Sequence, residues 1–136
     1  TIAETGHLVF GTLHTATAAE TIDRIVDVFP AHQQGQVRQQ LAATIRVIAS
    51  QRLLKAEGGG RVAGMEILVS NSAVKNLIRE GKTHQIDTVI QTGADKGMIL
   101  FEGHLVQLMQ RGTITLETAM EAAFRPGELQ RLMGKE

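Results

Sequence analysis

A short, almost continuous apolar run lies near the start of the chain, from Leu8 to Leu13. Such runs are typical of a central strand in a parallel sheet whose two faces are both covered by helices. The rest of the chain offers few further strand candidates. We therefore expect a strand here that belongs to a sheet of which only part is present.

The next segment has the periodicity of an amphipathic helix. Thr17 and Glu20 have the spacing of a capping box, in which each side chain bonds a free backbone donor. The apolar positions that follow recur three and four residues apart until Pro30 ends the helix. These positions are Ile22, Ile25, Val26 and Phe29.

A second helix is predicted from Gln34 to Ser50, because apolar residues continue at helical spacing over this range. Its expected buried stripe consists of Val37, Leu41, Ile45 and Ile48. Two strands are predicted next, one containing Leu53 and Leu54 and the other covering Arg61 to Val69. Three consecutive glycines before Arg61 favour a hairpin loop between them.

From residue 72 onward the pattern is helical. A short helix should end at Gly81, and another should cover Thr83 to Thr92. A third, containing Met98, should stop at Gly112, and Thr115 should cap a fourth. A last short helix is expected after a break at Arg125, Pro126 and Gly127. The predicted fold class is α/β: a partial sheet layer over residues 1–71, followed by a mainly helical cap over residues 72–136.

Composition excludes several function classes. The 14 basic and 14 acidic residues balance, and aromatic residues make up 3%, so neither a basic surface nor a stacking platform for nucleic acid is expected. The absence of cysteine excludes disulfides and thiolate metal sites. No apolar run approaches the roughly 20 residues that a membrane-spanning helix needs. We therefore expect no nucleic acid, no metal site and no membrane span.

Two histidines flank the apolar run and are the main candidates for chemistry. Open parallel sheets bind ligands beyond the carboxyl ends of their strands, where His14 lies between Thr12 and Thr15. A helix N-terminus follows, which favours anions, so His14 either contacts a phosphate or makes a local hydrogen bond. His7 would lie about 20 Å from His14 along a straight strand at about 3.3 Å per residue. One site holds both only if the strand is short or a neighbouring subunit contributes.

Within the 136 residues, no complete catalytic motif is found. Gly6 and Gly11 have the spacing of a phosphate-binding loop, but Thr12 stands where that loop needs lysine. Neither a Gly-x-Ser-x-Gly elbow nor a His-Glu-x-x-His zinc motif is present. We therefore expect this segment to be inactive by itself.

The segment Ala73–Glu80 has its apolar residues on one helical face. The outward side chains are Lys75, Asn76, Arg79 and Glu80. They form either an ordinary solvated face or a docking surface for a partner.

Several segments in the same order resemble the PilT-type retraction ATPases of type IV pili. Residues 4–15 resemble the histidine box of that family, and Thr21–Pro30 continues the match. Gln51–Leu54 follows at the expected place. Ala73–Glu80 is similar to the family signature Ala-Ile-Arg-Asn-Leu-Ile-Arg-Glu, and Glu128–Leu132 resembles the family's tail. The resemblance covers essentially the whole chain.

The sequence departs from the family pattern at two places. Ala16-Thr17-Ala18 stands where the family usually has Asn-Ser-Ala after the histidine box. Leu100-Phe101-Glu102 stands where the family tends to have Thr-Met-Asp. The first change removes a polar side chain near the histidine box, and the second affects the packing of the cap.

The resemblance implies the C-terminal part of a RecA-like P-loop ATPase that works as a hexameric ring and retracts pili in twitching motility. His14 and His7 would support catalysis at the nucleotide site, with Thr12 and Thr15 on the nucleotide side. The complete protein would bind ATP and Mg²⁺, whereas this segment alone would bind neither tightly, because the Walker motifs would precede Thr1. The expected partner is the inner-membrane pilus platform protein, and the expected location is cytoplasmic, peripheral to the inner membrane.

Two alternatives remain open from the sequence. The chain is a stand-alone docking module that uses Lys75, Asn76, Arg79 and Glu80, or it is part of a pilus-assembly or type II secretion ATPase. Many members of the second group carry a cysteine-rich metal motif in this region, which this chain lacks.

Overall fold

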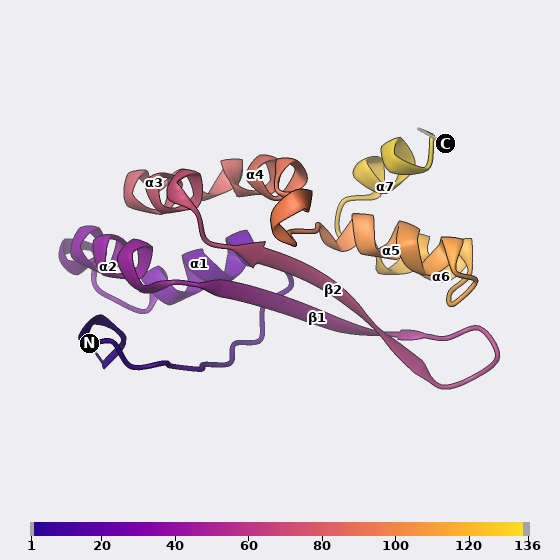
Figure 1. Cartoon of the computed structure of the whole chain (residues 1–136), viewed down its shortest axis with the longest axis horizontal. Coiled ribbons are helices and arrows are strands. Elements are labelled where there is room, and N and C mark those ends of the chain that lie inside the picture. The colour runs from indigo at the N-terminus through magenta and orange to yellow at the C-terminus, as the bar shows by residue number, and fades with distance from the viewer. Residues whose placement is uncertain (1, 135–136) are drawn as a thin grey trace.

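The structure is a computed structural model, and it describes residues 2–134. Seven α-helices and a two-stranded antiparallel sheet make up this described part, together with short 3₁₀ turns at Ile2–Thr5, Thr83–Gln85 and Ala94–Lys96 (Figure 1). In chain order the main elements are α1 (Ala18–Asp27), α2 (Ala31–Thr44), β1 (Val47–Lys55), β2 (Arg61–Val69), α3 (Ser72–Glu80), α4 (Ile86–Thr92), α5 (Phe101–Gln110), α6 (Leu116–Ala122) and α7 (Pro126–Met133).

The two strands form a long twisted hairpin that runs through the middle of the molecule (Figure 1). Val47 pairs with Val69 at one end and Lys55 with Arg61 at the other. Gly58, Gly59 and Gly60 in the connecting loop all have positive φ, which glycine adopts without a steric penalty. The predicted hairpin and its glycine loop are confirmed.

One face of the hairpin is buried, because side chains alternate between the two faces of a strand. Its buried positions are Ile48, Ser50, Leu54, Gly64, Glu66 and Leu68. The register pairs Ser50 with Glu66 in the middle of this face. A polar pair therefore interrupts an otherwise apolar surface.

Two apolar cores lie on this face, one towards each end of the hairpin. The first contains Ala18, Ile22, Ala42, Ile48, Leu68, Val74, Ile78, Ile86, Ile90, Met98 and Leu100. The second contains Leu54, Phe101, Leu105, Leu108, Ile114, Ala119, Ala122 and Leu129. Both combine residues from before and after position 71, and the division of the chain at that position stays a prediction.

The predicted helix from Gln34 to Ser50 is wrong in its extent. α2 ends at Thr44, Ile45 is extended, and β1 begins at Val47. The apolar residues keep helical spacing beyond the end of α2 only by coincidence. Ile48 is buried because it lies on the inward face of β1, where every second side chain points inward. Because Val47 and Ile48 are β-branched, pairing with β2 is the better use of this segment.

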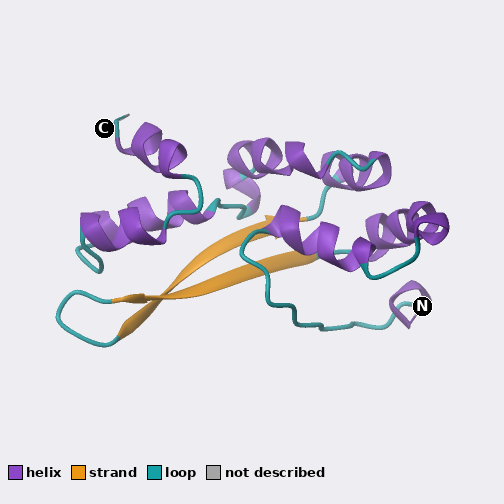
Figure 2. Cartoon of the chain, turned by 180° about the vertical axis from the view of Figure 1, so that it is seen from behind, coloured by secondary structure: helices purple, strands orange, loops and turns teal. Residues whose placement is uncertain are grey.

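The predicted strand from Leu8 to Leu13 is also wrong for this chain. Residues 7–15 have no regular secondary structure and no strand partner in the described part, and Figure 2 draws them as a loop leading to α1. Leu8 is 78% exposed and Phe10 is 88% exposed. A strand exists only through its neighbours, and β1 and β2 pair with each other instead.

The remaining helices agree with the prediction apart from their boundaries. α3 ends at Gly81, which has the left-handed conformation, and Thr115 caps α6. Met98 is buried but precedes α5. Pro126 does not interrupt a helix; it occupies the first turn of α7, where its missing N–H costs nothing.

Candidate functional site

The histidine segment, defined here as residues 7–15, lies on the surface. His7, Thr12 and His14 are exposed, and Thr15 is half-buried. The His7 ring nitrogen Nδ1 is 2.9 Å from the Thr5 hydroxyl. Among the described residues, His14 has no hydrogen-bond partner, so its imidazole is free to meet a ligand.

The C-terminal end of the histidine segment is attached to α1 by hydroxyl contacts. The hydroxyls of Thr15 and Thr21 are 2.6 Å apart, and Thr21 Oγ1 donates to the carbonyl of Thr17 at 2.8 Å. The contact between Thr15 and Thr21 therefore ties the end of the histidine segment to the start of α1.

The expected capping box at the start of α1 is confirmed. Glu20 N donates to Thr17 Oγ1 at 3.1 Å, and the Glu20 carboxylate accepts from Ala16 N at 3.0 Å. Ala18 N donates to Glu66 Oε1 at 2.9 Å. These three amides are already bonded within the chain, so an anion beside His14 would have to use other groups.

A cluster of buried charges, which the sequence did not reveal as a site, lies beneath this helix start. The Arg125 cluster consists of Arg125, Glu66, Glu102 and Asp87. Glu66 and Glu102 are fully buried. The sequence signal for this cluster is a charged residue at an inward-facing strand position. Glu66 lies between Gly64 and Leu68 on the buried face of β2.

Arg125 is the centre of this cluster. Its Nη1 donates to Glu66 Oε2 at 3.0 Å and to Glu102 Oε2 at 2.8 Å. Its Nε and Nη2 donate to the two oxygens of Asp87 at 2.8 and 3.0 Å. Burial opposes the charge of this guanidinium, but the hydrogen bonds and the charge of Glu66 outweigh it, with Glu102 and Asp87 adding to them, and raise the pKa of Arg125.

A half-buried histidine lies next to the Arg125 cluster. His104 in α5 accepts a hydrogen bond from the backbone N–H of Met65 through Nδ1 at 2.8 Å. Burial, and then the positive charge of Arg111, lower the pKa of His104. His104 is therefore a neutral structural acceptor that holds α5 against β2.

The four polar residues of the Ala73–Glu80 segment lie on α3, away from the histidine segment in sequence. Arg79 Nη1 donates to Asn76 Oδ1 at 3.2 Å, and Glu80 pairs with Lys82 at 2.9 Å. Asn76, Arg79 and Glu80 are exposed, whereas Lys75 is half-buried. The contacts stay local, so the face is free for a partner.

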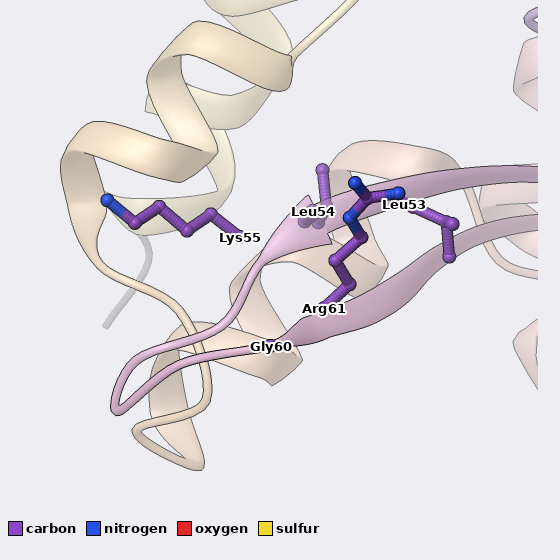
Figure 3. Close-up of a pocket in the computed structure, with 5 residues that line it drawn as sticks. All are labelled: Leu53, Leu54, Lys55, Gly60 and Arg61. Atoms are coloured by element: carbon purple, nitrogen blue, oxygen red, sulfur yellow. The ribbon is translucent and has the colours of Figure 1, made fainter.

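The cavities of the described chain add little to these candidates. A groove of about 740 Å³ is lined by residues around His7 and Phe10 and by the α2–β1 connection at Ile45. A smaller pocket of about 200 Å³ lies near the hairpin loop, where Lys55 and Arg61 point in different directions (Figure 3). Diverging cations do not make a ligand site.

Residues 2–134 contain neither a metal-binding cluster nor a membrane-spanning helix. No group of three or more His, Cys, Asp or Glu side chains is placed to hold a metal ion in this part of the chain. None of the helices described there is both long and apolar enough to cross a bilayer.

Comparison with known proteins assigns the chain to one family. The family described as "Type II/IV secretion system protein" matches residues 1–125. The chain belongs to this family. Two curated relatives are the type IV pilus retraction ATPase PilT of Pseudomonas aeruginosa, 51% identical over 93% of this chain, and a twitching motility protein of Neisseria gonorrhoeae, 53% identical over 90%.

Structural comparison agrees with the family assignment. The crystal structure of the pilus retraction motor PilT with bound ADP superposes with a TM-score of 0.82 at 50% identity and covers 92% of this chain. The resemblance to the PilT-type family is thereby confirmed. The chain spans about a third of the length of these relatives: 37% of the Pseudomonas protein, 33% of the Neisseria protein and 35% of the crystallised chain.

Proposed function

We propose that this chain is the C-terminal part of the RecA-like core, with its helical cap, of a hexameric motor ATPase that drives type IV pilus retraction. The observation that carries this proposal is the 50% identity and 0.82 TM-score to a retraction motor that binds ADP. The chain would work inside a longer protein, in the cytoplasm at the inner membrane.

The exposed apolar residues of the histidine segment support this proposal. Leu8, Val9 and Phe10 are each more than half exposed, although burying one such side chain is worth roughly 1.5–3 kcal/mol. A neighbouring strand from the rest of the motor would cover these residues and would turn residues 8–13 into the strand that their sequence predicts. His14 would then stand at the carboxyl end of a sheet strand, where such sheets bind ligands.

In the complete motor, His14 would contact the nucleotide, with Thr12 and Thr15 on the nucleotide side. His7 would support the same or a neighbouring subunit's site, since residues 8–13 in a strand would separate it from His14 by about 20 Å. Mg²⁺ bound with ATP supplies charge neutralisation at the phosphates. The fit of this chain to the nucleotide is partial: it offers exposed imidazoles and hydroxyls, while the amides at the start of α1 are engaged. Its part is therefore to orient and contact the nucleotide, and the phosphate loop would come from elsewhere in the motor.

The cap would serve a second purpose, which is docking. Asn76, Arg79 and Glu80 form an exposed polar face whose contacts stay on or next to α3. In the motor this face, with Lys75, would meet the inner-membrane platform protein or a neighbouring subunit. Reversing the charge with Arg79→Glu should then abolish twitching while ATP hydrolysis remains.

A chimera tests the proposal directly. In it, this chain replaces the matching segment of the Pseudomonas aeruginosa PilT, to which it is 51% identical. We expect the purified chimera to hydrolyse Mg-ATP within about tenfold of the parent, and the isolated chain to show no turnover. An inactive chimera that still assembles as a ring, or strong hydrolysis by the isolated chain, would contradict the proposal.

A further inference from the structure

The most informative feature outside the histidine segment is Glu66, a carboxylate buried between the two apolar cores. It accepts hydrogen bonds from two helix starts at once: Ala18 N in α1 at 2.9 Å and Phe101 N in α5 at 3.1 Å. A carboxylate is stabilised at a helix N-terminus by free amides and by the helix dipole. Glu66 therefore fixes where α1 and α5 begin relative to β2.

The position of Glu66 depends in turn on Arg125. The guanidinium bonds Glu66 and Glu102, both fully buried, and also pairs with Asp87 in α4. The backbone amides of Phe124 and Arg125 donate to Glu102 at 3.0 and 2.8 Å. One cation thus serves three carboxylates from three elements, and removing it would leave two buried charges unpaired.

We infer that Arg125 is a positioning residue that acts through Glu66 to fix the start of α1 and, through it, the position of Thr15 next to His14. This inference rests on the function proposed above. Glu66 accepts from the backbone N–H of Ala18, the first residue of α1, and Thr21 in the first turn of the same helix contacts the Thr15 hydroxyl at 2.6 Å. The cap is thereby connected to the histidine segment through Arg125, Glu66 and the first turn of α1.

The consequence is a mechanical connection between the two parts of the motor. A shift of α4, or of the chain at Arg125, against β2 would weaken the pair between Arg125 and Glu66, and Glu66 also accepts from Ala18 N. Partner binding on the cap would therefore alter the start of α1 without touching it. Arg125, Glu66 and Ala18 form a contiguous set of contacts, and coupling through them is demonstrated only if a change at Arg125 alters Ala18.

The first test uses the 136-residue chain and measures amide hydrogen exchange by NMR. Arg125→Lys keeps the charge but loses the forked geometry that reaches three carboxylates. We expect the Ala18 amide to exchange at least tenfold faster, although Arg125 does not touch Ala18. The matched control is Arg131→Lys, which makes the same change of head group in the Arg131–Glu128 pair on the surface of the cap. Unchanged exchange at Ala18 in the folded variant would overturn the inference.

A second variant protects this test against misfolding. Asp87→Asn weakens the hold on Arg125 from its more exposed side and leaves the contacts between Arg125 and Glu66 in place. We expect a smaller increase in Ala18 exchange, in the same direction. If neither folded variant changes Ala18 relative to the control, Arg125 is only a structural residue.

The second test measures ATP hydrolysis by the chimera. A positioning role predicts that Arg125→Lys lowers kcat at least fivefold and leaves KM for ATP within twofold, while Arg131→Lys changes neither. Equal kcat in both variants would overturn the inference. Failure of the unmutated chimera to hydrolyse ATP would count against the proposed function instead, and the exchange experiment separates the two cases.

Discussion

At the scale of single residues, the Arg125 cluster has more negative charges than positive ones. Three carboxylates face one guanidinium, and backbone amides supply the remaining donors: Ala18 and Phe101 for Glu66, and Phe124 and Arg125 for Glu102. Hydrogen bonds with an ionised partner are stronger than neutral ones, and Glu66 and Glu102 are fully shielded from water. The cluster is stable only while each carboxylate keeps its donors.

Removing the cation should therefore be costly. We expect Arg125→Leu to lower the free energy of unfolding by about 3–5 kcal/mol, because Glu66 and Glu102 would be buried without a counter-charge. Urea denaturation followed by circular dichroism measures this change. Arg131→Leu is the control and should change the free energy of unfolding little, since Arg131 is exposed to solvent. Equal effects of the two substitutions would contradict the description of the cluster.

The lowered pKa of His104 predicts a pH dependence with a definite sign. The folded state binds the proton more weakly than the unfolded chain, whose histidine pKa is about 6.5. The contribution of His104 to stability is therefore complete above that value and is lost as the pH falls through the lowered folded pKa. Protonation at Nδ1 would also remove the acceptor for Met65 N.

This prediction is checked by measuring the free energy of unfolding from pH 7.5 to 5. The wild-type chain should lose more stability on acidification than His104→Asn, whose Oδ1 can replace Nδ1 as acceptor without titrating. The control His32→Asn changes an exposed histidine in α2 and should keep the wild-type slope. The same slope in all three proteins would show that His104 does not titrate as described.

At the scale of elements, local chemistry was predictable and long-range pairing was not. Thr17, Gly81 and Thr115 were identified correctly because caps depend on neighbouring residues. The prediction of a strand at Leu8–Leu13 failed because a strand needs a partner, and residues 2–134 supply none for this segment. The end of α2 at Thr44 was not predicted, because the helical spacing of the apolar residues in Val37–Ile45 continues into β1.

The close contact between β2 and α5 depends on Gly64, which has no side chain. A Cβ at Gly64 would lie 2.6 Å from Phe101 Cε2 and 3.1 Å from Leu54 Cδ1. We expect Gly64→Ala to destabilise the chain by about 1–3 kcal/mol, because the aromatic ring would have to move within the second core. Thermal unfolding measures the shift.

Gly35 provides the matched control for this substitution. It lies inside α2, where an added Cβ would meet nothing within 4 Å. Gly35→Ala should be neutral or stabilising by up to about 1 kcal/mol, since alanine favours the helix. A stabilising Gly64→Ala would contradict the close packing of Phe101 against β2.

At the scale of the whole molecule, the candidate site is distributed over segments that the sequence does not connect. His14 and the histidine box were recognisable from consecutive residues, and their role at the nucleotide stays a prediction. The partners of Glu66 were not recognisable, because Ala18, Phe101 and Arg125 lie 48, 35 and 59 positions away in the chain. Only the fold brings them together, and it does so at the junction of the two cores.

The central claim is that the exposed His14 faces the nucleotide in the complete motor. The most direct test is to measure the steady-state rate of ATP hydrolysis by the PilT chimera. The variant His14→Ala is compared with the exposed control His32→Ala. We predict that His14→Ala lowers kcat at least tenfold while the hexameric ring and the stability of the fold are retained, and that His32→Ala keeps the full rate. Full activity of an intact His14→Ala ring would contradict the account.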